Sequence, residues 1–139
     1  MKKFAFIFLV LVAGVLFFFS YNFQIFENPC GNEILSESTN PNGLTKAVIF
    51  QRDCGATTGF STQVSILKSK EDLKNKGGNI FVADTNHGEA PSGIGGGPKV
   101  DVEWLSQNEL KIFYHPKART YTKSSSLNGI QIIYEEIEK

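Results

Sequence analysis

Cysteine is scarce in this sequence, and a surplus of basic side chains is missing. Two cysteines among 139 residues are too few for a disulfide-rich scaffold or a four-cysteine zinc site. Fourteen Lys and Arg side chains balance fourteen Asp and Glu, whereas nucleic-acid-binding proteins normally carry a basic excess, so we expect no nucleic acid partner. The length allows one folded domain and hardly two.

Acidic residues are absent before Glu27, and the same stretch holds a long apolar run. Two lysines precede sixteen consecutive apolar residues, from Phe4 to Phe19. As a helix this run spans roughly 24 Å, and extension to Phe26 gives roughly 34 Å, which exceeds a hydrocarbon core of about 30 Å. We therefore predict a signal anchor, a transmembrane helix over residues 1–26 that contacts the membrane from Phe4 to Phe26.

A basic start and an apolar centre are also typical of a cleaved secretory signal. Cleavage requires small residues one and three positions before the cut, and Ser20 is the only small residue between Gly14 and Pro29, which favours an uncleaved anchor. The residues before Cys30 also lack the small apolar run that precedes a lipidated cysteine. Because the positive charge precedes the span, the remainder is predicted to lie outside the cytoplasm. The expected location is the cytoplasmic (inner) membrane, single-pass, and the alternative is a secreted or periplasmic protein.

The pattern after residue 43 is that of an all-β domain. Apolar and polar side chains alternate in short runs, which predict strands at 45–52, 60–66, 80–83, 100–104, 110–114 and 130–135. We expect an antiparallel meander that forms a small sandwich or a partly open barrel, with Phe50, Phe60 and Trp104 in its core. Residues 27–43 are expected to be an irregular juxtamembrane segment, and residues 44–139 to be the extracytoplasmic β-domain.

The two cysteines, Cys30 and Cys54, are predicted to form a disulfide if the domain is exported. The bond would close a loop of about 25 residues, which should stabilise the fold by roughly 3–4 kcal/mol on the chain-entropy model. The bond would tie the segment after the apolar run to the end of the first predicted strand. Pairing between two chains and a free, reactive Cys54 are the alternatives, and no spacing in the sequence supplies a base for a reactive Cys54.

Two loops are candidates for a ligand-binding surface. The loop from Asp53 to Gly59 is rich in small and hydroxyl residues, which favours either a tight turn or a binding loop fixed by the disulfide. The loop from Asp84 to Lys99 is long and glycine-rich, and loops of that length in a small domain are often functional or mobile. The candidate ligand-binding residues are Asp53, Thr57, Thr58, Asp84, Asn86, His87 and Glu89.

The same loops give little support for catalysis or for a cofactor. Asp84, His87 and Glu89 are residue types that bind metals, but a zinc site needs fixed geometry, which a flexible loop does not supply, so no metal or cofactor is predicted. Paired carboxylates and a nucleophile elbow are both lacking, and Lys99 does not end a phosphate-binding loop because no Ser or Thr follows it. The sequence therefore does not predict an enzyme.

The stretch from Cys54 to Ile66, which reads Cys-Gly-Ala-Thr-Thr-Gly-Phe-Ser-Thr-Gln-Val-Ser-Ile, resembles a family of small bacterial exported proteins. The turn at Asn40–Gly43 and the stretches Gly78–Asp84 and Val102–Leu105 resemble the same family. The resemblance covers about half of the exported part. It implies a bacterial exported or membrane-anchored module and carries no activity.

The leading hypothesis is a non-enzymatic extracytoplasmic domain that binds a protein or cell-envelope ligand through these two loops. An immunity protein against a toxin that acts outside the membrane has the same size and placement. A small hydrolase or metal-binding protein that uses His87 with Asp84 or Glu89 is the third class. A toxin gene beside this one would favour the second class, and a phenotype of the His87→Ala variant would favour the third.

Overall fold

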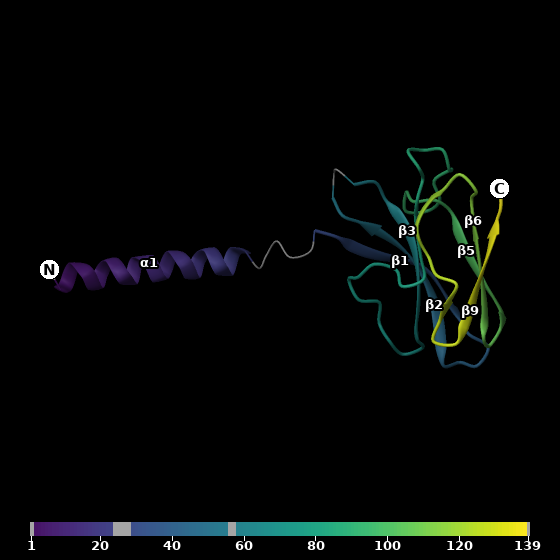
Figure 1. Ribbon diagram of the computed structural model, residues 1–139, viewed down its shortest axis with the longest axis horizontal. Helices are drawn as coiled ribbons and strands as arrows, with labels where there is room; N and C mark the ends of the chain where they lie inside the picture. The colour runs from purple at the N-terminus through teal and green to yellow at the C-terminus, as the bar shows by residue number, and fades with distance from the viewer. Residues whose placement is uncertain (1, 24–28, 56–57, 139) are drawn as a thin grey trace.

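The computed structural model describes residues 2–23, 29–55 and 58–138 as one helix and nine strands (Figure 1). The helix α1 spans Lys2–Phe23 and extends away from the strands. Several of its apolar side chains face solvent, among them Phe8 and Phe17, which are 69% and 74% exposed. The strands form the compact part of the molecule.

The prediction of a transmembrane helix over residues 1–26 is not supported. Among the described residues, no helix combines the length and the apolarity that crossing a membrane requires. The apolar run from Phe4 to Phe19 spans only about 24 Å, and the prediction reached a sufficient length by extension to Phe26. The helix α1 ends at Phe23, and residues 24–28 lie outside the described part of the chain.

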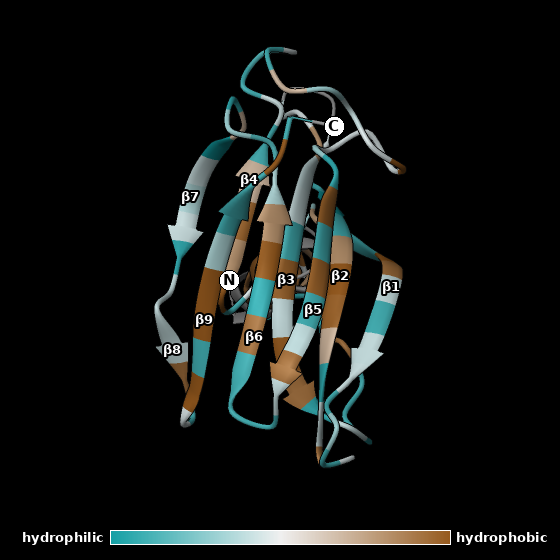
Figure 2. Cartoon of the chain, turned by 90° about the vertical axis from the view of Figure 1, so that its right-hand side faces the viewer, coloured by the Kyte–Doolittle hydropathy of each residue, from teal (hydrophilic) through white to brown (hydrophobic). Residues whose placement is uncertain are grey.

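The strands form two sheets that pack face to face as a sandwich (Figure 2). The five-stranded sheet has the order β1-β2-β3-β4-β7, and the four-stranded sheet has the order β5-β6-β9-β8. The strands are β1 (Gly31–Thr39), β2 (Thr45–Asp53), β3 (Ser61–Lys68), β4 (Phe81–Asp84), β5 (Val100–Ser106), β6 (Glu109–Tyr114), β7 (Arg119–Lys123), β8 (Ser126–Leu127) and β9 (Ile130–Glu136).

The fold confirms the expected all-β class and the sandwich, and it corrects the topology. A simple antiparallel meander was expected, but the chain changes sheets after β4, after β6 and after β7. As a result β6 and β9 run parallel, with Glu109 opposite Gln131 and Tyr114 opposite Glu136. Parallel neighbours need a crossover connection, and here β7 and β8 supply it.

Residues 27–43 were expected to be irregular, yet Gly31–Thr39 forms the edge strand β1. β1 pairs antiparallel with β2 and contains a bulge between Ile34 and Ser36. Its polar sequence conceals it, because an edge strand buries few side chains and shows little apolar alternation. The Trp104 indole NH donates to the carbonyl of Ser38 at 3.0 Å and so links this edge to β5 of the other sheet.

The core lies between the two sheets. The central strands turn alternate side chains into it, as in Ala47 and Ile49 of β2 and Leu110 and Ile112 of β6, all of which are buried. Phe50 is also fully buried as predicted, but it does not belong to this cluster. Trp104 packs against the core while partly buried. Phe60 is the exception to the predicted core, because it is 43% exposed.

Phe50 and Val48 point to the outer face of the five-stranded sheet, because they alternate with Ala47 and Ile49 along β2. Both are fully buried. The chain between β3 and β4, residues 69–80, approaches this face through hydrogen bonds to Gln63, Arg52 and Asn32. The polar segment 69–80 therefore lies beside one half of the outer face. The other half remains open.

The predicted disulfide between Cys30 and Cys54 is present, and it closes a loop with a sequence separation of 24. It joins the chain just before β1 to the chain just after β2, where Gly31 and Asp53 are already strand partners. Asn75, in the segment between β3 and β4, donates to the Cys30 carbonyl at 2.7 Å. The disulfide therefore fixes the start of the β2–β3 loop at one end of the sheet.

Candidate functional site

A row of polar side chains crosses the open half of the five-stranded sheet. Arg52 on β2 is the strand partner of Ser61 on β3, Ser61 is the partner of Asp84 on β4, and Asp84 is the partner of Arg119 on β7. Because strand partners share a face, the four side chains project from the same side of the sheet. The row places a hydroxyl and a carboxylate between two guanidinium groups.

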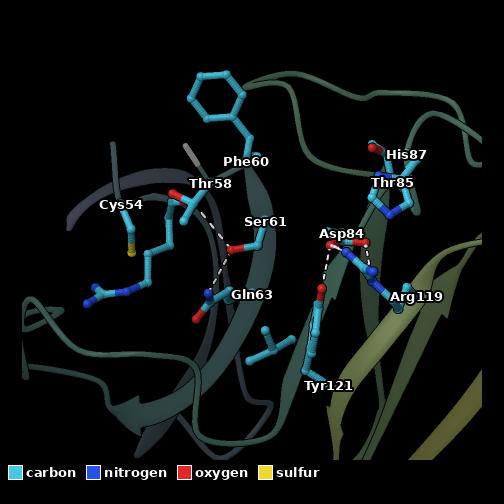
Figure 3. Close-up of a pocket in the computed structure, with 13 residues that line it drawn as sticks. Cys54, Thr58, Phe60, Ser61, Gln63, Asp84, Thr85, His87, Arg119 and Tyr121 are labelled. Carbon is cyan, nitrogen blue, oxygen red and sulfur yellow. Dashed lines mark hydrogen bonds and ion pairs between the residues drawn. The ribbon is translucent and has the colours of Figure 1, made fainter. Parts of the chain in front are cut away.

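These four residues line a pocket of about 570 Å³, which is a size typical of small-molecule sites. Gln63, Val82 and Tyr121 complete its floor, and residues of the β2–β3 loop and of the turn after β4 form its rim. Figure 3 shows Asp84, Arg119 and Tyr121 together on one side, with Ser61 and Gln63 facing them and Phe60 above. The pocket is therefore built by side chains from four neighbouring strands.

Asp84 is the most strongly engaged residue of the pocket. Its carboxylate accepts hydrogen bonds from Nε and Nη2 of Arg119, at 3.2 and 2.5 Å, and from the Tyr121 hydroxyl at 2.6 Å. The backbone NH of Asn86 donates to the same carboxylate at 2.8 Å. Burial raises the pKa of Asp84, but the hydrogen bonds from Arg119 and Tyr121 outweigh it, so this pKa lies below its ordinary value.

The two partners of Asp84 are also held to each other. The Arg119 guanidinium lies 5.2 Å from the centre of the Tyr121 ring, within the range of a cation–π contact. The hydrogen bond to Asp84 raises the pKa of Arg119 and also that of Tyr121. Tyr121 is 59% exposed, so its ring is fixed at one edge and open to solvent elsewhere.

The described residues of the β2–β3 loop form one wall of the pocket. The first turn of this loop is closed locally, because the Asp53 carboxylate accepts from the Gly55 NH at 2.9 Å. The NH and the hydroxyl of Thr58 both donate to the Gly55 carbonyl at 3.1 Å. Together with the disulfide at Cys54, these bonds constrain the wall, and Thr58, Gly59 and Phe60 then line the pocket.

The turn after β4 forms the opposite wall. Asn86 and His87 both have positive φ, 50° and 58°, and the Gly88 NH donates to the Thr85 carbonyl at 3.1 Å. Two consecutive left-handed residues are typical of a tight type I′ turn, and His87 is an unusual residue for that conformation. The turn brings His87 and Thr85 to the rim of the pocket beside Arg119, as Figure 3 shows.

The glycine-rich loop after this turn supports Phe60 from behind. Gly96 has φ +89°, and a Cβ at this position would lie 2.6 Å from Cδ2 of Phe60. The backbone of Gly96 therefore lies directly against the ring. The loop is held by the hydrogen bond from the Thr62 hydroxyl to the Pro98 carbonyl, at 2.7 Å, and by that from the Gly93 NH to the Gly97 carbonyl, also at 2.7 Å.

The sequence-predicted site residues divide into three groups. Thr58, Asp84 and His87 come together in the pocket. Asp53 and Asn86 do not line the pocket but lie in the turns beside it. Asp53 accepts from the Gly55 NH, and the Asn86 NH donates to Asp84. Glu89 lies away from it and forms an exposed ion pair of 4.0 Å with Lys117. Thr57 lies outside the described residues.

Sequence reasoning missed Arg52, Arg119 and Tyr121, and it assigned Phe60 to the core. Arg119 and Tyr121 belong to β7, a short polar strand with no apolar alternation. No local pattern indicated that β7 would return to the first sheet beside β4. The alternation of Phe60 and Thr62 with Ser61 predicted a strand that starts at Phe60 and buries it, but β3 begins only at Ser61, so Phe60 immediately precedes the strand.

In the described part of the chain, no group of three or more His, Cys, Asp or Glu side chains is placed to hold a metal ion. Asp84 turns its oxygens to Arg119 and Tyr121, and Glu89 pairs with Lys117. What the pocket offers is two aromatic rings, a cation at each side, and hydroxyl and amide groups between them. Searches found no family model, curated protein or solved structure that matches this chain.

Proposed function

We propose that this protein is a non-enzymatic binding domain that acts outside the cytoplasm, and that the pocket on the five-stranded sheet holds a cell-envelope ligand. The observation that carries the proposal is the row from Arg52 to Arg119, with Phe60 and Tyr121 beside it in one pocket. A few polar groups placed around exposed aromatic rings are the usual composition of a recognition site.

The bonding of the polar groups favours recognition over catalysis. A general base needs a carboxylate or imidazole whose pKa lies near the working pH, whereas the pKa of Asp84 is held low by Arg119 and Tyr121. Ser61 accepts a hydrogen bond from Gln63 and donates one to the Arg52 carbonyl, at 2.8 and 3.3 Å, so no adjacent base activates it. These groups are placed to hold a ligand in one orientation.

The disulfide supports the location. Cys30 and Cys54 are bonded to each other, and stable structural disulfides are rare in cytosolic proteins because the thiol pool there is reducing. The same bond fixes one wall of the pocket. An extracytoplasmic location would therefore also preserve the binding site.

The proposal is tested by retention of the full-length protein on immobilised envelope fractions, one of polysaccharide and one of protein. We expect retention that the double variant Phe60→Ala, Tyr121→Ala loses. The control is Phe113→Ala, which alters an aromatic ring on the four-stranded sheet. Retention that survives the double variant, or that Phe113→Ala removes equally, would contradict the pocket as the binding site.

A further inference from the structure

We propose that the ligand of this pocket is an acidic oligosaccharide, a chain of sugar rings that carry carboxylates. This inference rests on the proposed function and names its ligand class. The geometry points to a carboxylate at Arg52, and to sugar rings placed against Phe60 and Tyr121. The steps of the argument are the charge of the pocket, the pairing of its backbone and the arrangement of its rings.

The charge of the pocket is positive. Asp84 and Arg119 neutralise each other, whereas Arg52 forms no ion pair with the described acidic residues. Nη1 of Arg52 instead donates to two neutral amide oxygens, of Asn32 at 2.6 Å and of Asn75 at 2.9 Å. These bonds orient the guanidinium without cancelling its charge. A planar guanidinium held in this way suits a carboxylate, to which it can donate two parallel hydrogen bonds.

The segment that holds Arg52 adds to this positive field. Lys74 and Lys76 flank Asn75, and both are exposed at the surface. Lys74 pairs with Glu71 at 4.0 Å, whereas Lys76 forms no ion pair with the described acidic residues. The backbone carbonyls of Lys74 and Lys76 accept from the Asn32 amide at 3.0 and 2.8 Å, so the segment is fixed beside Arg52. A chain of formal net charge zero thus presents two cations without an ion pair to the described acidic residues, Arg52 in the pocket and Lys76 beside it. These cations attract an anionic ligand, and the attraction weakens with salt.

The backbone under the pocket is unsuited to an extended peptide. Ser61, Gln63 and Asp84 lie on β3 and β4, which are interior strands with a neighbour on each side. Peptides that bind sheets usually add a strand at a free edge, where backbone groups are unpaired. β7, which contributes Arg119 and Tyr121, is the one described strand of the pocket at a sheet edge. Over β3 and β4 recognition must use side chains. A ligand that carries its own hydroxyl groups on rigid rings meets that condition.

The aromatic rings provide apolar surfaces around the polar row. Phe60 is 43% exposed and is backed by Gly96, so one side of its ring is fixed while the rest lies free. Tyr121 is 59% exposed and is fixed through its hydroxyl to Asp84. The apolar face of a sugar ring packs on such surfaces while its hydroxyls reach the polar groups between them. Because both side chains are already held in place, they lose little conformational entropy when a ligand binds.

The test is isothermal titration of the full-length protein with trigalacturonate, with its methyl ester and with a triglutamate peptide. The ester keeps the rings and hydroxyls and removes the charge. We expect trigalacturonate to bind at least tenfold more tightly than the ester, and the preference to fall as salt rises. The variant Arg52→Gln should bind trigalacturonate and its ester with the same affinity, the one that the unaltered protein has for the ester. Arg52→Lys, which keeps the charge, should retain part of the preference.

The control is Lys99→Gln, because Lys99 is an exposed cation that pairs with Asp101 at 3.3 Å and lies outside the pocket. Its preference should equal that of the unaltered protein. Equal affinity for acid and ester, or no binding of either, would overturn the acidic oligosaccharide. Triglutamate binding as tightly as trigalacturonate would overturn it in favour of an acidic peptide. Retention on an envelope fraction that still depends on Phe60 and Tyr121 would then leave the proposed function standing with another ligand.

Discussion

Asp84 and Arg119 are partners on the neighbouring strands β4 and β7, and their side chains are joined by two hydrogen bonds across the floor of the pocket. β7 reaches this position only after the chain has visited the other sheet. The pair therefore joins the edge strand β7 to its interior neighbour β4 at the point where the pocket opens. It orders the floor before any ligand arrives.

The first prediction concerns this pair. Asp84→Asn removes the charge that orients Arg119 and Tyr121, so we expect ligand binding to weaken at least several-fold and the urea midpoint of unfolding to fall. The control is Asp101→Asn, whose ion pair with Lys99 is more than half exposed on both sides. Exposed pairs contribute little, so this variant should keep its midpoint and its binding. Equal effects of the two variants would contradict the role given to Asp84.

The pH dependence of stability gives a second prediction. Because the pKa of Asp84 is lower in the folded than in the unfolded chain, its contribution is present above an unfolded pKa of about 3.9 and is lost as the pH falls through the lower folded value. We expect the difference in unfolding free energy between the protein and Asp84→Asn to be constant at neutral pH and to shrink in acid. A difference that stays constant down to pH about 2 would show that the Asp84 charge is not the cause.

Tyr134 gives a third prediction, at the alkaline end. Burial raises its pKa to about 12, and its hydroxyl donates to the carbonyl of Ser124 at 2.7 Å. A raised folded pKa means that stability is retained below the unfolded value of about 10 and is lost as the pH rises towards the folded value. Stability should therefore fall between these two values, and Tyr134→Phe should reduce that fall, while the raised pKa of Tyr121 leaves a remainder. Ultraviolet absorbance of phenolate and urea unfolding across this range would measure it.

A fourth prediction concerns Gly96 and the ring that it supports. Gly96→Ala places a Cβ 2.6 Å from the Phe60 ring at φ +89°, whereas Gly129→Ala, at φ +80°, meets no atom within 4 Å. Both variants carry the cost of positive φ, about 1 kcal/mol, and Gly96→Ala adds a clash of similar size. We expect Gly96→Ala to be the less stable and to weaken binding. Adding Phe60→Ala to Gly96→Ala should relieve the clash and so restore part of the lost stability, but it should not restore binding.

The disulfide gives a fifth prediction. Removing the bond between Cys30 and Cys54 should lower the free energy of unfolding by roughly 3–4 kcal/mol on the chain-entropy model. It should also loosen the β2–β3 loop, so binding should weaken under reductant. The double variant Cys30→Ser, Cys54→Ser should behave like the reduced protein and should not respond to reductant. Unchanged binding in the double variant would show that the loop is held by its other contacts.

The sequence predicted well where alternation was strong. The strands around Ile49, Val64 and Ile112 were expected within a few residues of their observed bounds, because each buries one face in the core. The cysteine pair was also predicted, since no other cysteine was available to either. These features depend on local pattern and on composition, which a single sequence displays.

The remaining features depend on long-range pairing. β1 and β7 are polar edge strands, and their place in the sheet is set by partners far along the chain. One local signal was overlooked, since Asn128 and Gly129 both have positive φ and form the turn between β8 and β9. That Asn-Gly pair could have predicted the hairpin. No signal of this kind places Arg119 beside Asp84, so most of the pocket could not be predicted.

Amide NMR of the full-length protein during titration with the polysaccharide fraction of the envelope tests the central claim most directly. We expect the shifts to cluster at residues 58–63, 84–87 and 119–121, around the pocket, and to be lost in the double variant Phe60→Ala, Tyr121→Ala. The amide shifts of β5, β6 and β9 should remain unchanged. Shifts that concentrate on that four-stranded sheet, or that persist in the double variant, would contradict the account.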